Sequence, residues 1–208
     1  MDNDATRIGR RSIRLRQFDY SEPGMYYVTI RTKGGECLFG DVVKGEVRLS
    51  GMGTVAEECW QAIPEHFLNV SLDLFVVMPN HVHGILVIKE RLPASVRVEY
   101  IQPIREETRS TQPTRRKNEF QHVVPGSLGS IIRSYKAAVT RICHKKGMTA
   151  FKWQRDLYDH IIRDGKDLDR IRKYILDNPM NWANDENFPG NIRMDEMQEG
   201  DEEWSGSD

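Results

Sequence analysis

The order of strand-like and helix-like segments constrains the fold of this chain more than any other feature of its sequence. Pairs of short runs rich in β-branched and aromatic residues are followed by segments in which apolar residues recur every three to four positions. The runs predicted as strands are 25–31, a hairpin within 38–49, 72–77, 83–88 and 158–163. The segments predicted as helices are 51–67, 127–146 and 167–178. Paired strands followed by helices are typical of an α+β domain, so we expect an antiparallel sheet with helices packed on one face rather than a parallel doubly wound sheet.

Length and local composition divide the chain into one domain with additions. Its 208 residues are too few for two full-sized domains. We expect the domain itself to span 21–184, after a basic N-terminal arm at 1–20. A polar insertion at about 90–126 is longer than the loops of compact domains usually are. An acidic tail at 185–208 is expected to lack a fixed structure.

The net charge of −1 conceals an uneven distribution. Residues 185–208 carry a net charge of −8, which leaves +7 on residues 1–184. A basic body with an acidic tail is found in proteins that bind nucleic acid. A solvated surface with a flexible tail would give the same distribution of charge. The side chains that could contact the phosphates of a nucleic acid come from the predicted helix 127–146 and from the insertion. They are Arg133, Lys136, Arg141 and Lys145 on the helix, and Arg115 and Arg116 in the insertion.

Several classes of protein are disfavoured by what the sequence lacks. No stretch approaches the roughly 18 consecutive apolar residues of a membrane span, and the charged N-terminus lacks the apolar segment of a secretory signal. The three cysteines are odd in number and far apart, which argues against a disulfide framework and against a cysteine-based zinc site. We therefore expect a cytoplasmic protein with no membrane contact.

The first candidate site is the sequence His81-Val82-His83. On a strand, residues two apart share a face while the residue between them points to the other face. Both imidazoles can therefore point to one place while Val82 enters the core. Two imidazoles on a rigid strand can hold a divalent cation and leave coordination positions open for a phosphate. Alone, the motif is more often an ordinary pair of surface histidines.

The second candidate site is the pair Tyr174 and Asn178, four residues apart on a predicted helix. This spacing places both side chains on the same helix face. A phenolic oxygen can act as a nucleophile, and an amide oxygen can act as a metal ligand. The alternative is structural: a half-buried tyrosine near a helix end, with Asn178 capping that end before Pro179.

Four runs in a fixed order resemble the single-tyrosine HUH transposases, in which U is a hydrophobic residue. The runs are MPNHVHGILV at 78–87, WQR at 153–155, YDHIIR at 158–163 and YILDNP at 174–179. Together they are most similar to the REP-associated tyrosine transposases, over roughly residues 14–182. The resemblance implies a ferredoxin-like α+β domain of the HUH endonuclease type. It also implies a homodimer that acts on single-stranded or hairpin DNA.

The resemblance also implies a role for each matched residue. His81 and His83 correspond to the metal ligands, Asn178 to a third ligand, and the metal to Mg²⁺ or Mn²⁺. Tyr174 corresponds to the nucleophile, which attacks a DNA phosphate and leaves a 5′-phosphotyrosine and a free 3′-OH. A covalent link of this kind preserves the energy of the phosphodiester, so strands can be rejoined without ATP.

The match has departures, and it leaves other functions open. Relatives more often carry glutamine where Asn178 stands, and many have an aromatic residue where Leu157 stands. His160 lies in a family motif without an assigned role, and a core or supporting position is its simpler interpretation. The alternatives to a transposase are a plasmid relaxase or replication-initiation nickase, and a non-catalytic nucleic-acid-binding protein that retains the fold.

Overall fold

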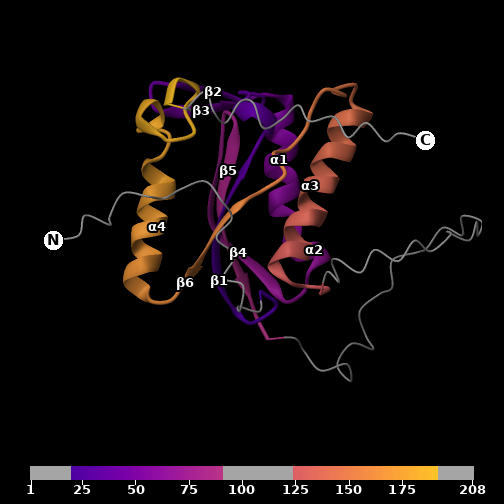
Figure 1. Ribbon diagram of the computed structural model, residues 1–208, viewed down its shortest axis with the longest axis vertical. Coiled ribbons are helices and arrows are strands. Elements are labelled where there is room, and N and C mark those ends of the chain that lie inside the picture. The colour runs from indigo at the N-terminus through magenta and orange to yellow at the C-terminus, as the bar shows by residue number, and fades with distance from the viewer. Residues whose placement is uncertain (1–19, 91–123, 192–208) are drawn as a thin grey trace, which may run out of the picture.

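The computed structural model describes residues 20–90 and 124–191 (Figure 1). The strands are β1 (Gly24–Arg31), β2 (Gly40–Val43), β3 (Glu46–Leu49), β4 (Val70–Met78), β5 (His81–Ile88) and β6 (Tyr158–Ile162). The helices are α1 (Gly51–Gln61), α2 (Ile63–His66), α3 (Leu128–Lys145) and α4 (Gly165–Asp177), with short 3₁₀ turns η1 (Lys33–Gly35), η3 (Trp182–Asn184) and η4 (Pro189–Asn191). The N-terminal arm, most of the insertion with Arg115 and Arg116, and the tail beyond residue 191 lie outside the described residues.

The central sheet has four strands in the order β4-β5-β1-β6, and all neighbouring strands are antiparallel. A separate hairpin pairs β2 with β3 around Lys44 and Gly45, whose positive φ angles suit a tight turn. β4 and β5 are joined by the two residues Pro79 and Asn80, so that Met78 pairs with His81. The antiparallel sheet and the α+β class are thereby confirmed.

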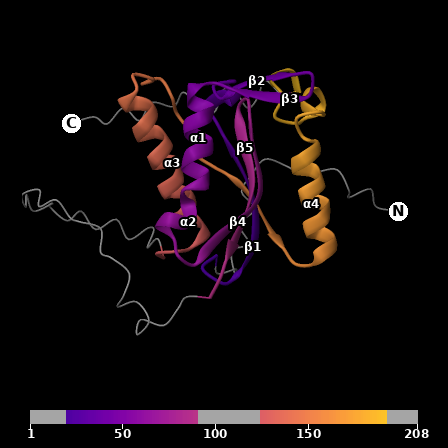
Figure 2. The ribbon, with the colours of Figure 1, turned by 180° about the vertical axis from the view of Figure 1, so that it is seen from behind.

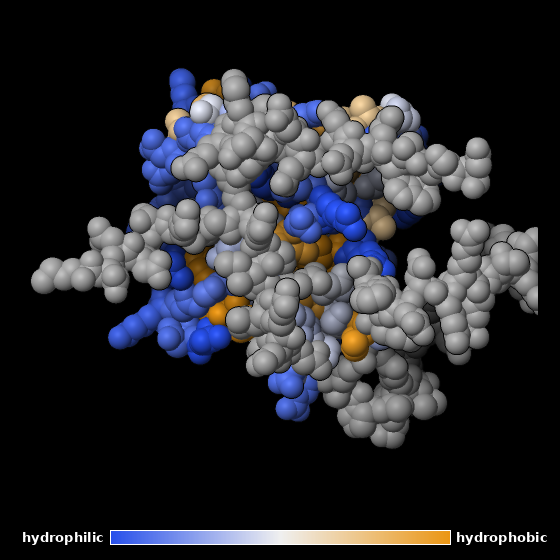
Figure 3. All heavy atoms as spheres, viewed as in Figure 1, coloured by the Kyte–Doolittle hydropathy of each residue, from blue (hydrophilic) through white to orange (hydrophobic). Residues whose placement is uncertain are grey.

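The helices lie on both faces of the sheet, as Figure 1 shows and as the reverse view in Figure 2 confirms. The expectation that they share one face is correct for α1 and α3 and wrong for α4. The reason lies in β1, where Val28 faces the core under α1 and α3 while Tyr27 faces Ile171 and Ile175 of α4. A strand with apolar residues at both alternating positions can be covered on both faces. In the space-filling view of Figure 3, apolar residues show through near the centre, with hydrophilic residues at the flanks.

The predicted helix 51–67 is divided in two. α1 begins at Ser50, whose Oγ accepts hydrogen bonds from the backbone N–H groups of Met52 and Gly53 at 3.2 Å each. The helix ends at Gln61, and the four-residue α2 follows after Ala62. Pro64 explains the break, since it has no N–H to continue the helical bonding and its ring clashes with the preceding turn.

The packing of α1 on β5 requires the glycine that follows the second histidine. A Cβ built on Gly84 would overlap the indole ring of Trp60, and Trp60 is fully buried. The absence of a side chain at Gly84 therefore allows α1 to lie close to the strand that carries both histidines. None of the helices in the described part of the chain has the length and apolar character needed to cross a membrane.

Candidate active site

His81 and His83 project from β5 toward the face of the sheet that carries α4. Their Nε2 atoms lie 2.9 Å apart, and both side chains are at most 1% exposed. Val82 points the opposite way and is fully buried in the core under α1 and α3. This is the geometry expected from the alternation of side chains along a strand. The two imidazoles thus converge on one point.

Each imidazole is held by its Nδ1 atom, which leaves Nε2 directed into the site. His81 Nδ1 lies 2.8 Å from the side-chain oxygen of Asn80, an acceptor, so this nitrogen carries the proton. His83 Nδ1 lies 2.9 Å from Thr29 Oγ1 and 2.8 Å from Tyr27 Oη. With both Nδ1 atoms protonated, two lone pairs would face each other at 2.9 Å. A cation between them would remove the repulsion.

Burial keeps both histidines in their neutral form. It lowers the pKa of His83 to about 4, although the nearby Asp185 acts in the opposite direction. It also lowers the pKa of His81 well below the usual value, and the positive charge of Arg31, with that of His83 whenever it is protonated, adds to the effect. Metal-binding histidines must be deprotonated, so this environment suits a metal site at neutral pH.

Tyr174 extends from α4 over the same point. Its ring lies 5.2 Å from the ring of His83 between centroids, and 41% of the residue is exposed. Its hydroxyl donates a hydrogen bond to Asp185 Oδ2 at 3.2 Å. Burial raises the pKa of Tyr174, and the negative charges of Asp185 and Glu186 raise it further. The phenol is therefore protonated at neutral pH.

Polar contacts at two points fix α4 against the sheet. Arg172 donates two hydrogen bonds to Asp73 on β4, at 2.9 and 2.6 Å, in a paired arrangement. Near the start of the helix, His160 Nε2 on β6 lies 2.7 Å from Asp167 Oδ2. This contact fits the core or supporting position expected for His160 from the sequence. These contacts hold Tyr174 beside the histidines of its own chain.

Asp185 belongs to the site, although its position in the acidic tail gave no indication of this. It is 6% exposed and accepts hydrogen bonds from Asn178 Nδ2 at 2.7 Å and from the backbone N–H of Asn187 at 2.6 Å. Three potential ligand atoms lie within 4.8 Å of one another, one each from His81, His83 and Asp185. The tail was predicted to begin at Asp185, but residues 185–191 are folded against the domain.

An aromatic signal could have identified this folded segment. Trp182 packs on Phe188 with ring centroids 5.3 Å apart, and it also lies 5.8 Å from the ring of His81. Both aromatic residues come before the long acidic stretch, so the boundary between domain and tail belongs after them.

Two asparagines connect the parts of the site. Asn178 is 3% exposed, and its Oδ1 has no hydrogen-bond partner among the described residues. Asn80 is fully buried and donates from Nδ2 to the backbone oxygens of Gly35, at 2.8 Å, and Asn187, at 2.7 Å. Asn80 was present in the motif that carries the histidines, but sequence reasoning gave it no role. It joins the turn before β5 to the segment after α4.

An open cavity of about 600 Å³ lies beside Tyr174. Its lining comes from β1, β6, α4 and the segment after α4. It includes the cations of Arg170 and Lys173, the ring of Tyr158 and the side-chain amides of Asn181 and Asn184. The cavity therefore offers cationic and amide donors and an aromatic surface, together with the carboxylates of Asp177, Asp185 and Glu186.

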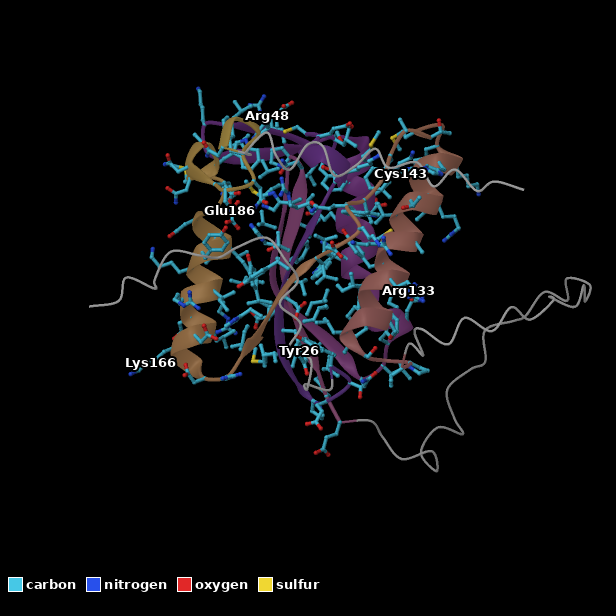
Figure 4. All side chains as sticks on the ribbon, viewed as in Figure 1. Tyr26, Arg48, Arg133, Cys143, Lys166 and Glu186 are labelled. Atoms are coloured by element: carbon cyan, nitrogen blue, oxygen red, sulfur yellow. The ribbon has the colours of Figure 1, made fainter. Side chains whose placement is uncertain are left out.

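The basic residues of α3 lie on the other side of the sheet. Figure 4 shows Arg133 on α3 and Glu186 beyond the end of α4, on opposite sides of the molecule. Lys136 donates from Nζ to the backbone oxygen of Gln154 at 2.9 Å, so it helps to join α3 to the chain before β6. Arg141 and Lys145 are exposed. The structure thus brings His81, His83, Tyr174 and Asn178 together, but it does not bring α3 to them.

Known proteins resemble this chain in sequence and in fold. No protein-family model matches it. An uncharacterized protein of Haemophilus influenzae is 38% identical over 177 residues, which cover 85% of this chain and 92% of that protein. A solved structure of a REP-associated tyrosine transposase bound to a REP hairpin aligns with a TM-score of 0.51 and 16% identity, over 81% of this chain and 73% of that chain. The chain therefore belongs to one family with the H. influenzae protein, and its fold is that of a REP-associated tyrosine transposase.

Proposed function

We propose that this protein is a metal-dependent DNA strand transferase of the HUH class. It cleaves single-stranded or hairpin DNA and forms a 5′-phosphotyrosine on Tyr174. One observation carries the proposal: a tyrosine hydroxyl, two imidazole nitrogens and a carboxylate surround one point beside an open cavity. The homodimer implied by the sequence resemblance stays a prediction.

The donor atoms of the site fit a divalent cation. His81 and His83 offer neutral Nε2 atoms, and Asn178 offers a buried Oδ1 that has no hydrogen-bond partner among residues 20–90 and 124–191. Oxygen donors suit Mg²⁺ and Mn²⁺. Bound there, the ion would polarise the scissile phosphate and offset the negative charge that develops during attack.

Tyr174 carries the covalent step. Its oxygen attacks the phosphorus, so that a phosphorus–oxygen bond to Tyr174 forms and the bond to the 3′ oxygen breaks. The phenol proton passes to water, to which Tyr174 is 41% exposed, and the 3′ oxygen takes up a proton from water. The phosphate stays on the 5′ side, which allows the same strand or another one to be joined later.

The cavity supports DNA as the substrate class. Arg170 and Lys173 can contact phosphates next to the scissile one, and Tyr158 can stack on an unpaired base. Asn181 and Asn184 can hydrogen-bond base edges, which are accessible in single strands and hairpin loops. The solved protein of the same fold was bound to a REP hairpin.

The test is formation of a covalent adduct on Tyr174. The wild type is incubated with Mn²⁺ and a labelled hairpin taken from palindromic repeats beside its gene, and adducts are separated under denaturing conditions. Tyr174→Phe should bind the hairpin but form no adduct. The matched control is Tyr158→Phe, since Tyr158 lines the same cavity and is not the proposed nucleophile. Mass spectrometry should locate the DNA on Tyr174.

A second arm tests the metal. His81→Ala combined with His83→Ala should reduce adduct formation by about a hundredfold or more. Chelation of the wild type should have the same effect, and added Mg²⁺ or Mn²⁺ should reverse it. If the wild type with metal forms no adduct with any flanking hairpin, the non-catalytic DNA-binding alternative is correct. An adduct on Tyr158 would retain the HUH class and refute the assignment of Tyr174.

A further inference from the structure

We propose that Asp185 is a direct ligand of the same cation and supplies the negative charge that the buried site requires. The inference rests on the proposed function, since it concerns the same metal. It departs from the sequence resemblance, which places the third ligand, Asn178, on the tyrosine helix. Asp185 lies beyond that helix, directly after η3.

The first argument is the charge balance. A cation buried without a counter-charge is strongly unfavourable. His81 and His83 are buried and offer neutral nitrogens, and the amide of Asn178 is also neutral. Among the His, Cys, Asp and Glu side chains of the described residues, His81, His83 and Asp185 form the one group of three whose ligand atoms come together, and Asp185 is its only carboxylate. A site made of histidines and amide alone would leave both charges of a divalent ion unpaired.

The second argument is the number of acceptor positions on Asp185. A carboxylate has about four lone-pair positions. Within the described part of the chain three are used, by the Asn178 side chain at 2.7 Å, the Tyr174 hydroxyl at 3.2 Å and the backbone N–H of Asn187 at 2.6 Å. One position remains for a cation. The same three bonds fix the orientation of the carboxylate, so little motion is lost when an ion binds.

The third argument is the unpartnered oxygen beside it. Because Asn178 donates its Nδ2 to Asp185, its amide is fixed next to the carboxylate, and its Oδ1 is buried without a partner among the described residues. An unpaired buried acceptor is unfavourable unless something else binds it. Two nitrogens and two oxygens would give a six-coordinate ion four ligands from the chain. Two positions would remain for phosphate oxygens or water.

The experiment measures Mn²⁺ binding directly, without DNA. Wild type, Asp185→Asn and Asp177→Asn are titrated with Mn²⁺ by isothermal calorimetry, and their thermal unfolding is recorded with and without the ion. Asp185→Asn keeps the shape and an acceptor oxygen while it removes the charge. Asp177 is the matched control, because it lines the same cavity but pairs with Lys173 at 2.7 Å. We expect Asp185→Asn to weaken Mn²⁺ binding by at least about tenfold and to lose most of the Mn²⁺-induced rise in Tm.

A change of metal preference separates a ligand from a merely structural carboxylate. In Asp185→Cys, a thiolate replaces the carboxylate, and thiolates prefer softer ions. If Asp185 is a ligand, this variant should bind Mn²⁺ more weakly and Cd²⁺ more tightly than the wild type. It should also show an ultraviolet absorption band from cadmium–thiolate bonding that the wild type with Cd²⁺ lacks. A structural role would not produce the band.

The outcomes separate this inference from the proposed function. If Asp185→Asn folds and binds Mn²⁺ like the wild type, or if Asp185→Cys gains no affinity for Cd²⁺, Asp185 is not a ligand, and the adduct test on Tyr174 is unaffected. If both metal tests succeed but the wild type forms no adduct with DNA, the ligand assignment stands and the proposed function fails. An effect of Asp177→Asn as large as that of Asp185→Asn would indicate a general loss of negative charge and overturn the inference.

Discussion

Replacement of Asn80 should damage stability and metal binding together, because one buried side chain connects three parts of the site. Asn80 accepts from His81 Nδ1 at 2.8 Å and donates to the backbone oxygens of Gly35 and Asn187 at 2.8 and 2.7 Å. Each such bond contributes about 1 kcal/mol net. Asn80→Ala should therefore reduce the free energy of unfolding by about 3 kcal/mol.

The same substitution should also weaken Mn²⁺ binding. Without the acceptor, His81 loses the bond that fixes its ring orientation and keeps the proton on Nδ1. Loss of a partner that orients a metal-binding histidine typically reduces affinity by about 10- to 100-fold. In addition, the segment that carries Asp185 loses one of its attachments, through Asn187.

Urea unfolding of the metal-free protein and calorimetric titration with Mn²⁺ measure the two effects. The control is Asn69→Ala, because Asn69 makes an exposed bond of 3.5 Å to Lys89, and its replacement should cost no more than about 0.5 kcal/mol. If Asn80→Ala loses less than about 1 kcal/mol and binds Mn²⁺ as the wild type does, the reasoning from hydrogen bonds is refuted.

Three further predictions follow from the packing, the charges and the position of α3. Gly84→Ala should lower the free energy of unfolding in urea by about 1–3 kcal/mol, because the new Cβ would overlap the ring of Trp60. Adding Trp60→Phe to this variant should recover part of the lost stability. The pKa of His83 is lowered from 6.5 to about 4, so the unfolded chain binds more protons than the folded one between these pH values. The free energy of unfolding of the metal-free protein should therefore fall by up to about 3 kcal/mol as the pH falls from 6.5 to 4. A flat profile of stability against pH in EDTA would contradict this. Lys173→Ala should reduce the slope of the logarithm of the hairpin binding constant against the logarithm of salt concentration by about 0.7. Lys145→Ala, on the far side of the sheet, should leave this slope unchanged. The opposite result would place the DNA on α3.

Local patterns in the sequence were sufficient to predict the elements that carry the histidines and the tyrosine. The alternation along β5 indicated that His81 and His83 share a face, and the helical spacing indicated the same for Tyr174 and Asn178. Both inferences depend on the geometry of a single strand or helix. For the same reason, the break at Pro64 was detectable in principle, since proline interrupts a helix wherever it stands in the interior.

The parts that were not predicted depend on contacts between distant residues. Asn80 and Asn187 are 107 positions apart, and their bond joins a side chain to a backbone oxygen that any residue could provide. Such a bond leaves no periodic trace in the sequence. The placement of α4 has a similar cause: its apolar stripe shows that it packs on something, but the choice of face depends on how the sheet is already covered by α1 and α3.

Burial determines the protonation state of the side chains at the candidate site, and this state would suit the proposed metal and phosphate together. The buried environment lowers the pKa of His83 and raises that of Tyr174, so both side chains are held in their uncharged forms. A divalent ion favours a neutral imidazole and a phenolate at once, because each can offer it a lone pair. In the proposed site, one positive charge of the ion is offset by Asp185, and the other is left for the DNA phosphate and the oxygen of Tyr174. The positive charge is then greatest at the place where negative charge develops during cleavage.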